Sequence, residues 1–232
     1  MTTPITLAFD VYGTLFSDIS ICKAMEQFVG DNARKFTTAL REKQIEYSFR
    51  RGLMRDYAPF HVCIEDALEY TCYTFDLELK ESDKKELLDS YLCLQIFPDV
   101  LDALEELKSA GYRMSILSNG HPDDLNKLLQ NAKITDYFED IVSVDEIGSF
   151  KPNPEVYELF LKYSGTKKEN TWMVSGNTFD FIGAMSYGFK GAYVNRSTDV
   201  VFDPWEIDPT VVVENLTELA TKIKDNLTQT KS

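Results

Sequence analysis

Residues 5–14, ITLAFDVYGT, decide the fold that the rest of this 232-residue chain builds on. The mainly apolar run from Ile5 ends abruptly in an acid, Asp10, and the turn residues Gly13 and Thr14 follow. A short apolar run closed by turn residues is typical of a strand buried inside a sheet. We therefore predict a buried strand over residues 5–10, with a carboxylate at its end.

Strand and helix patterns alternate from residue 98 onward. The strand-like runs are RMSILSN (113–119), DIVSV (140–144), TWMVSGN (171–177), GAYVNR (191–196) and TVVVEN (210–215). Between and after them lie stretches with helical spacing: PDVLDALEELKSAG (98–111), PDDLNKLLQNA (122–132), PEVYELFLKYSG (154–165), DFIGAMSYG (180–188) and NLTELATKIKDNL (215–227). This alternation predicts an α/β fold with a doubly wound, mostly parallel Rossmann-like sheet.

A block of helices interrupts this pattern after the first strand. Its four segments with apolar residues at three-to-four spacing are ICKAMEQFV (21–29), ARKFTTALREKQIEYSFRRGLM (33–54), FHVCIEDALEYTCYTF (60–75) and DKKELLDSYLCLQ (83–95). An insertion after the carboxyl end of a strand lies beside the crevice where such sheets bind ligands. We therefore expect a core domain of residues 1–15 and 97–232, and a helical cap domain of residues 16–96.

Composition excludes several classes of protein. A hydrophobic share of 44% can form a core, which excludes a disordered or fibrous chain. The 24 Lys and Arg against 38 Asp and Glu give a net charge of −14, which repels phosphate backbones and anionic lipid. We expect no nucleic-acid and no membrane partner. The start of the sequence lacks a basic, apolar leader, so a cytoplasmic location is expected.

Polar residues gather where the predicted strands end. Neighbouring parallel strands bring their carboxyl ends to one crevice, so these residues are expected to meet there. They are Asp10, Tyr12 and Thr14, then Ser118 and Asn119, then Lys151 in a loop, and finally Ser175, Asn177 and Asp180. The set predicts a carboxylate nucleophile beside hydroxyl and amide donors, a lysine and a second carboxylate.

Five motifs in register resemble the L-2-haloacid dehalogenases (type II) of the haloacid dehalogenase superfamily. They are DVYGTLF (10–16), LREKQIEY (40–47), LSNG (117–120), SFKPNPEVY (149–157) and SGNTFD (175–180), and the match runs from about residue 5 to 220. The resemblance implies a hydrolase that converts L-2-haloacids into D-2-hydroxyacids through an ester on Asp10. It also implies a 2-haloacid and a halide ion as ligands, a homodimer, and no cofactor or metal.

The resemblance carries roles over to matching positions. Arg41 would receive the departing halide, with Asn119 beside it. Ser118 and the backbone of Val11 and Tyr12 would hold the substrate carboxylate, helped by Lys151. Thr14 and Ser175 would position Asp10, and Tyr157 would orient Lys151. Asn177 and Asp180 would place and activate water. An apolar wall around the nucleophile would come from Tyr12, Ile45, Phe60 and Phe179.

The residues leave two alternative functions to consider. A magnesium-dependent phosphatase of the same superfamily carries a second acid two residues after its nucleophile, where this chain has Tyr12. It carries another acid at the position of Gly176, so only Asp10 and Asp180 of that set are present. Magnesium prefers carboxylate-rich oxygen ligation, which speaks against this alternative. The third possibility is a catalytically silent chain that acts by binding.

Four positions depart from the haloacid dehalogenase pattern, and one of them is Gly176, where serine is common. Glu42 stands where glutamine is usual, and an ionised glutamate next to Arg41 could neutralise it or repel an anionic substrate. Phe179 stands where tryptophan is usual, and Ile45 where leucine is usual. One buried methylene is worth only about 0.8 kcal/mol, so the last two are expected to adjust which acid fits.

Overall fold

The computed structural model describes residues 4–196 and 201–229, and its centre is a parallel sheet. The six strands of this sheet lie in the order β5-β4-β1-β6-β7-β8, and all their pairings are parallel. Their bounds are β1 (Thr6–Phe9), β4 (Arg113–Ser118), β5 (Ile141–Ser143), β6 (Thr171–Ser175), β7 (Lys190–Val194) and β8 (Val211–Val213). The predicted doubly wound α/β fold is confirmed.

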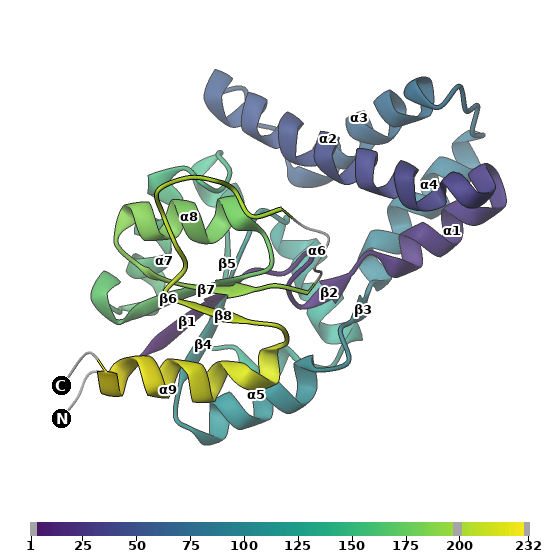
Figure 1. Ribbon diagram of the computed structural model, residues 1–232. Helices are drawn as coiled ribbons and strands as arrows, with labels where there is room; N and C mark the ends of the chain where they lie inside the picture. The colour runs from purple at the N-terminus through teal and green to yellow at the C-terminus, as the bar shows by residue number, and fades with distance from the viewer. Residues whose placement is uncertain (1–3, 197–200, 230–232) are drawn as a thin grey trace.

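Helices cover both faces of the sheet (Figure 1). The helices α7 and α8 lie on one face, and α5 and α9 on the other. The bounds are α5 (Val100–Ser109), α6 (Pro122–Asn131), α7 (Pro154–Ser164), α8 (Thr178–Tyr187) and α9 (Leu219–Gln229). Short 3₁₀ turns are η1 (Gly30–Asn32), η2 (Tyr91–Cys93), η3 (Thr135–Tyr137), η4 (Val144–Ile147), η5 (Lys168–Asn170) and η6 (Leu216–Glu218).

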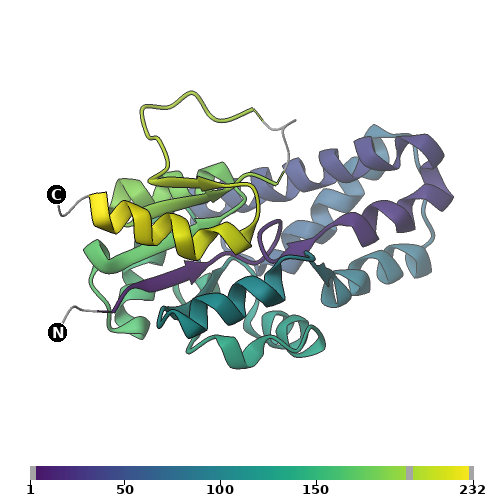
Figure 2. The same ribbon diagram turned by 60° about the horizontal axis from the view of Figure 1, so that its bottom comes forward.

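The four remaining helices form a block to one side of the sheet (Figures 1 and 2). They are α1 (Ile19–Val29), α2 (Ala33–Met54), α3 (Phe60–Thr74) and α4 (Glu81–Ser90), and we call them the helical block. The block has buried apolar residues that form a cluster of their own: Met25, Ala33, Phe36, Leu40, Ala67, Leu68, Cys72 and Leu87. Burial of such a cluster stabilises the block independently of the sheet.

The connections to the block are where the sequence prediction was incomplete. The chain leaves the sheet through β2 (Phe16–Ser17) and returns through β3 (Gln95–Ile96), and these two strands pair antiparallel. A two-residue strand is too short to show any periodicity in the sequence. The fourth helix, predicted to run to residue 95, ends at Ser90 because the chain must turn into η2 and β3.

Sheet register aligns the strand ends that matter for the site. Phe9 pairs with Ile116 of β4 on one side and with Val174 of β6 on the other. The residues just beyond these pairs therefore lie side by side at the carboxyl edge of the sheet. Within the part of the chain that the structure describes, no helix is long and apolar enough to span a bilayer.

Candidate active site

Asp10 lies at the centre of the carboxyl edge of the sheet and is almost fully buried. Its backbone N–H donates to the carbonyl of Val174 at 3.0 Å, so the ladder between β1 and β6 holds the main chain of Asp10 in place. Its Oδ2 accepts hydrogen bonds from Thr14 Oγ1 at 2.7 Å and from Asn177 Nδ2 at 2.8 Å, with Ser175 Oγ at 3.4 Å. These donors fix the orientation of the carboxylate.

The turn after Asp10 brings Thr14 back to the carboxylate. The carbonyl of Val11 accepts the N–H groups of Thr14, Leu15 and Phe16, which closes a tight turn over residues 11–16. Gly13 adopts φ +78° there, a conformation that residues with a Cβ rarely adopt. The sequence DVYGT thus places a hydroxyl four residues after the acid it contacts.

Lys151 joins two carboxylates. Its side chain is 1% exposed, and its Nζ donates to Asp10 Oδ1 at 2.8 Å, to Asp180 Oδ2 at 2.6 Å and to the carbonyl of Leu117 at 3.0 Å. An ammonium group has three protons, so these three acceptors use all of them. The ammonium therefore lies between the two acids and partly neutralises them.

The charges at this centre shift the pKa of each acid in a different direction. Burial alone would raise the pKa of Asp10, but the charge and hydrogen bond of Lys151 and the hydrogen bond of Thr14 hold it below its ordinary value. Burial raises the pKa of Asp180 to about 7, with Lys151 opposing and the Asp10 charge adding to the rise. Asp10 is therefore ionised at neutral pH, whereas Asp180 gains and loses its proton near neutral pH.

Asp180 lies in the first turn of α8, and its carboxylate is fully buried. While Oδ2 accepts from Lys151, no donor among residues 4–196 and 201–229 meets hydrogen-bonding geometry at its Oδ1, although the nearby Ser175 hydroxyl lowers the pKa of this carboxyl. A buried carboxylate oxygen without a donor lowers the stability of the fold, so its presence in a site calls for a functional explanation. This oxygen is suited to accept a proton from a water molecule or a ligand.

Tyr157 was expected to orient Lys151, and its hydroxyl contacts Asp180, an acid that itself binds the Lys151 ammonium. The Tyr157 hydroxyl donates to the backbone carbonyl of Asp180 at 3.1 Å, so this phenol supports the start of α8. Its ring is fully buried and packs against Tyr187 and Phe189. Tyr157 therefore supports the acid that contacts Lys151, and the lysine is oriented by its carboxylate and carbonyl acceptors.

Arg41 carries positive charge from the helical block into the site. From α2, its Nη2 donates to the carbonyl of Tyr12 at 3.2 Å and to Asn177 Oδ1 at 3.0 Å. Asn177 in turn donates to the Tyr12 carbonyl at 2.9 Å and to Asp10. Arg41 is thus two hydrogen bonds away from the Asp10 carboxylate.

The loop after β4 holds the second pair of expected ligand-binding residues. Asn119 was expected beside Arg41 at the halide, and its Oδ1 accepts the backbone N–H of Lys151 at 2.9 Å. Ser118 Oγ accepts the N–H of Gly120 at 3.1 Å. Both residues directly follow Leu117, whose carbonyl accepts a hydrogen bond from the Lys151 ammonium.

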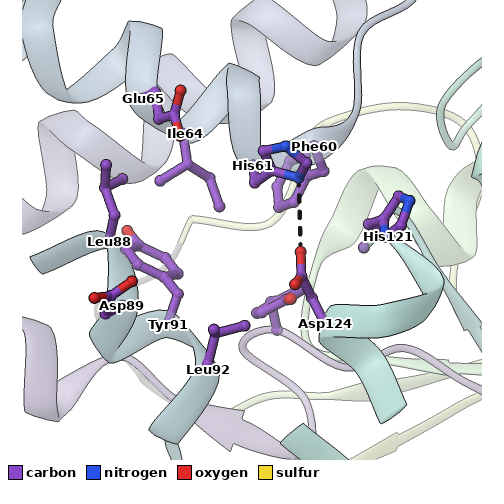
Figure 3. A pocket seen from close by; sticks show the side chains of 12 residues that line it. Phe60, His61, Ile64, Glu65, Leu88, Asp89, Tyr91, Leu92, His121 and Asp124 are labelled. Atoms are coloured by element: carbon purple, nitrogen blue, oxygen red, sulfur yellow. Dashed lines mark ion pairs between the residues drawn. The ribbon is translucent and has the colours of Figure 1, made fainter. Parts of the chain in front are cut away.

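The four residues of the expected apolar wall fall into two groups. The rings of Tyr12 and Phe60 lie 5.8 Å apart, and both line a cavity of about 200 Å³ between the block and the core. Figure 3 shows this cavity, with Ile64 and Tyr91 among its lining residues. Phe179 packs against Phe49 of α2, with ring centroids at 5.3 Å. Ile45 is half-buried on the same helix.

Two positions that departed from the expected pattern have clear environments. Glu42 is exposed, whereas the neighbouring Arg41 contacts the site. Gly176 packs closely against the nucleophile turn, since a Cβ atom there would lie 2.5 Å from the carbonyl oxygen of Gly13. An acid at position 176, as in the phosphatase pattern, would therefore require the turn to move.

Sequence reasoning missed one residue that contacts this turn. Arg196, just beyond β7, donates to the carbonyl of Thr14. The sequence could have pointed to Arg196, because it ends a predicted strand and so lies at the same sheet edge as the other strand-end residues. In the described ranges no group of three or more His, Cys, Asp or Glu is arranged to hold a metal ion.

Comparison with known proteins gives consistent matches. The haloacid dehalogenase-like hydrolase family matches residues 6–186. The (S)-2-haloacid dehalogenase of Pseudomonas fluorescens is 35% identical over 219 residues, which cover 94% of this chain and 96% of that protein.

Solved structures match over nearly the whole fold. The L-2-haloacid dehalogenase from Xanthobacter autotrophicus is 33% identical, with a TM-score of 0.89 over 96% of this chain and 99% of that one. The same enzyme with chloropropionic acid covalently bound is 33% identical, with a TM-score of 0.88 over 96% and 99%. The chain belongs to the haloacid dehalogenase-like hydrolase family.

Proposed function

We propose that this chain catalyses the hydrolytic dehalogenation of L-2-haloacids to D-2-hydroxyacids without a metal ion. The observation that carries the proposal is the pair of buried carboxylates, Asp10 and Asp180, joined through one ammonium group at 2.8 and 2.6 Å. The ammonium supplies the positive charge that a metal ion supplies in a carboxylate-rich site. The covalently bound chloropropionic acid in the Xanthobacter structure supports the ester route.

In the first step, the Asp10 carboxylate attacks C2 of the substrate from the side opposite the halogen. A carbon–oxygen bond forms, the carbon–halogen bond breaks, and the halide leaves with the bonding electrons. Its lowered pKa keeps Asp10 ionised, as this attack requires. Attack from behind inverts the centre, so an L acid gives a D product.

Local cations offset the net charge of −14 when an anionic substrate binds. We infer that Ser118 and the backbone of Val11 and Tyr12 hold the substrate carboxylate. Lys151, whose three protons already have acceptors, helps through its positive charge. Arg41 and Asn119 receive the halide ion. Charge-assisted hydrogen bonds contribute roughly 1.5–3 kcal/mol each, whereas a distant surface field is screened by salt.

In the second step, water attacks the carboxyl carbon of the Asp10 ester. Asp180 takes the proton from that water, because its Oδ1 has no donor among the described residues and its pKa is about 7. The ester bond breaks at Asp10, and the product leaves with an oxygen that belonged to Asp10. That proton passes from Asp180 to the product alkoxide. Asp10 regains an oxygen from water, and the second proton of that water is released to solvent, which restores the Asp10 carboxylate.

The helical block is the cap of this site in our proposal. Its Arg41 contacts the core through Tyr12 and Asn177, and its Phe60 packs on Tyr12. We divide the chain into a core of residues 1–15 and 97–232 and a cap of residues 16–96. Aromatic and aliphatic side chains from the cap exclude water from the carboxylate, which strengthens it as a nucleophile.

Assembly and location are also part of the proposal. Exposed apolar side chains on α2 and α3 support a homodimer: Leu53, Met54, Tyr70 and Tyr73. Sedimentation of the purified chain at micromolar concentration is expected to give twice the 26.6 kDa chain mass. A cytoplasmic location stays a prediction.

The function is tested by following chloride release from L- and D-2-chloropropionate in the presence of a chelator. Release from the L form alone is expected. Absence of release from both, together with magnesium-dependent release of phosphate from small phosphate esters, would replace this proposal with a phosphatase. Silence in both assays would point to a chain that acts by binding.

A further inference from the structure

Arg196 lies just beyond β7 and contacts the nucleophile turn through its backbone. Its Nη2 and Nε donate to the carbonyl of Thr14 at 2.8 and 3.1 Å. The Thr14 hydroxyl, in the same residue, donates to Asp10 Oδ2 at 2.7 Å and accepts the N–H of Gly176 at 2.8 Å. The guanidinium therefore holds the backbone of the same residue whose hydroxyl orients Asp10.

The other edge of the same guanidinium contacts the segment that returns from the helical block. Its Nη1 donates to both carboxylate oxygens of Asp99 at 2.9 and 3.1 Å. The guanidinium also lies 3.8 Å from the ring centroid of Phe97. Asp99 is held in turn by the N–H of Leu216, which donates to its Oδ2 at 2.6 Å.

Arg196 thus contacts both connections between the core and the block at once. Thr14 precedes β2, and Phe97 and Asp99 follow β3. The backbone links the two connections as well, since the N–H of Phe97 donates to the carbonyl of Leu15 at 3.0 Å. The Arg196 side chain is 14% exposed, so water screens these charge-assisted contacts little.

We propose that Arg196 is a positioning residue that fixes Thr14, and through it the Asp10 carboxylate, to the two connections between the core and the helical block. The inference rests on the proposed function only for its kinetic consequence. A rigid planar fork can hold a carbonyl and a carboxylate in one plane, which a lysine ammonium cannot do. The nucleophile and the block are thereby held in one fixed geometry.

The kinetic test compares R196A and R196K with the wild type. L-2-chloropropionate at saturation is mixed with each protein, and the fraction of Asp10 present as ester is followed by acid quench and mass spectrometry. The rate constant of ester formation should fall about tenfold or more in R196A, with KM nearly unchanged and R196K in between. The folded fraction of each variant is measured separately by circular dichroism, because the amount of ester depends on the rates of both its formation and its hydrolysis.

R113A is the matched control. Arg113 also pairs with a carboxylate, Glu139, with Nε 2.8 Å from Oε2, but it lies at the opposite end of β4 from the site. This variant should keep the wild-type rate constant. An R196A protein with a reduced folded fraction and an unchanged rate constant would show that Arg196 serves only to stabilise the fold, which overturns the proposal.

A second readout does not depend on activity. The carboxyl of Asp10, labelled with ¹³C and assigned by its loss in D10N, is titrated by NMR in the wild type, R196A and R113A. The Thr14 hydrogen bond helps to hold the Asp10 pKa down, so R196A should titrate at higher pH and R113A should not. Unchanged titration in R196A would overturn the proposal. If the wild type is inert toward haloacids, the proposed function fails and this titration alone decides the role of Arg196.

Discussion

Lys151 donates a 2.6 Å hydrogen bond to Asp180, from a side chain that is 1% exposed to a carboxylate that is fully buried. The same Nζ contacts Asp10, so one cation serves two acids. Burial would favour a neutral lysine, but the two carboxylates raise its pKa above the ordinary value. Lys151 is therefore charged in the folded protein, and when Asp180 is ionised the three groups together carry the net charge of a single carboxylate.

Replacement of Lys151 by methionine is expected to destabilise the protein strongly. Two buried carboxylates then face each other without a cation, and loss of one partner of a buried pair costs about 3–5 kcal/mol in the free energy of unfolding. Urea denaturation at pH 7 measures this change in the free energy of unfolding.

The matched control is K162M, because Lys162 is 73% exposed and its pair with Glu146 spans 3.7 Å. The control should change stability by less than about 0.5 kcal/mol. Equal effects in both variants would contradict the central role of Lys151.

The pH dependence of ester hydrolysis is expected to report Asp180. In the free protein its pKa is about 7, raised first by burial and further by the negative charge of Asp10. Ester formation removes that charge, so the pKa of Asp180 in the intermediate should fall below its free value. Hydrolysis of the ester should therefore slow as the pH drops through a pKa below about 7, because protonated Asp180 cannot accept a proton.

Single-turnover quench measurements across pH 5–8 test this expectation. In D180N the hydrolysis step should slow by about 10²- to 10⁴-fold, and the ester should accumulate on Asp10. A D180N profile that matches the wild type in both rate and pH dependence would remove Asp180 from the role of base.

Replacement of Glu42 by glutamine is expected to leave turnover within about twofold of the wild type. Glu42 is exposed, and the neighbouring Arg41 contacts the Tyr12 carbonyl and Asn177. A solvent-screened charge on the outer side of α2 should affect the site little. Steady-state chloride release from L-2-chloropropionate compares the turnover of the Glu42→Gln variant with that of the wild type. A large rise in kcat/KM would mean that Glu42 reaches the anion in the working enzyme.

Much of the fold could be predicted because its signals are local. The alternation of apolar runs and helical spacing predicted the six strands of the main sheet, and parallel strands bring their ends to one edge by geometry alone. The contacts of Asp10 with Thr14, Lys151, Asn177 and Ser175 follow from that geometry.

The rest could not be predicted because its signals are not in residue type or spacing. β2 and β3 have two residues each, too few for a pattern. Arg196 contacts a backbone carbonyl, which any residue at position 14 would offer. Tyr157 likewise contacts the carbonyl of Asp180, and its partner depends on how α7 packs against α8.

The most direct test of the account is one turnover in water enriched in ¹⁸O, with protein in excess over L-2-chloropropionate. The account predicts that the label enters the carboxyl group of Asp10 and that the hydroxyl of the D-2-hydroxyacid stays unlabelled. Label in the product hydroxyl, with none in the peptide that carries Asp10, would mean that water strikes the substrate carbon directly and that no ester forms.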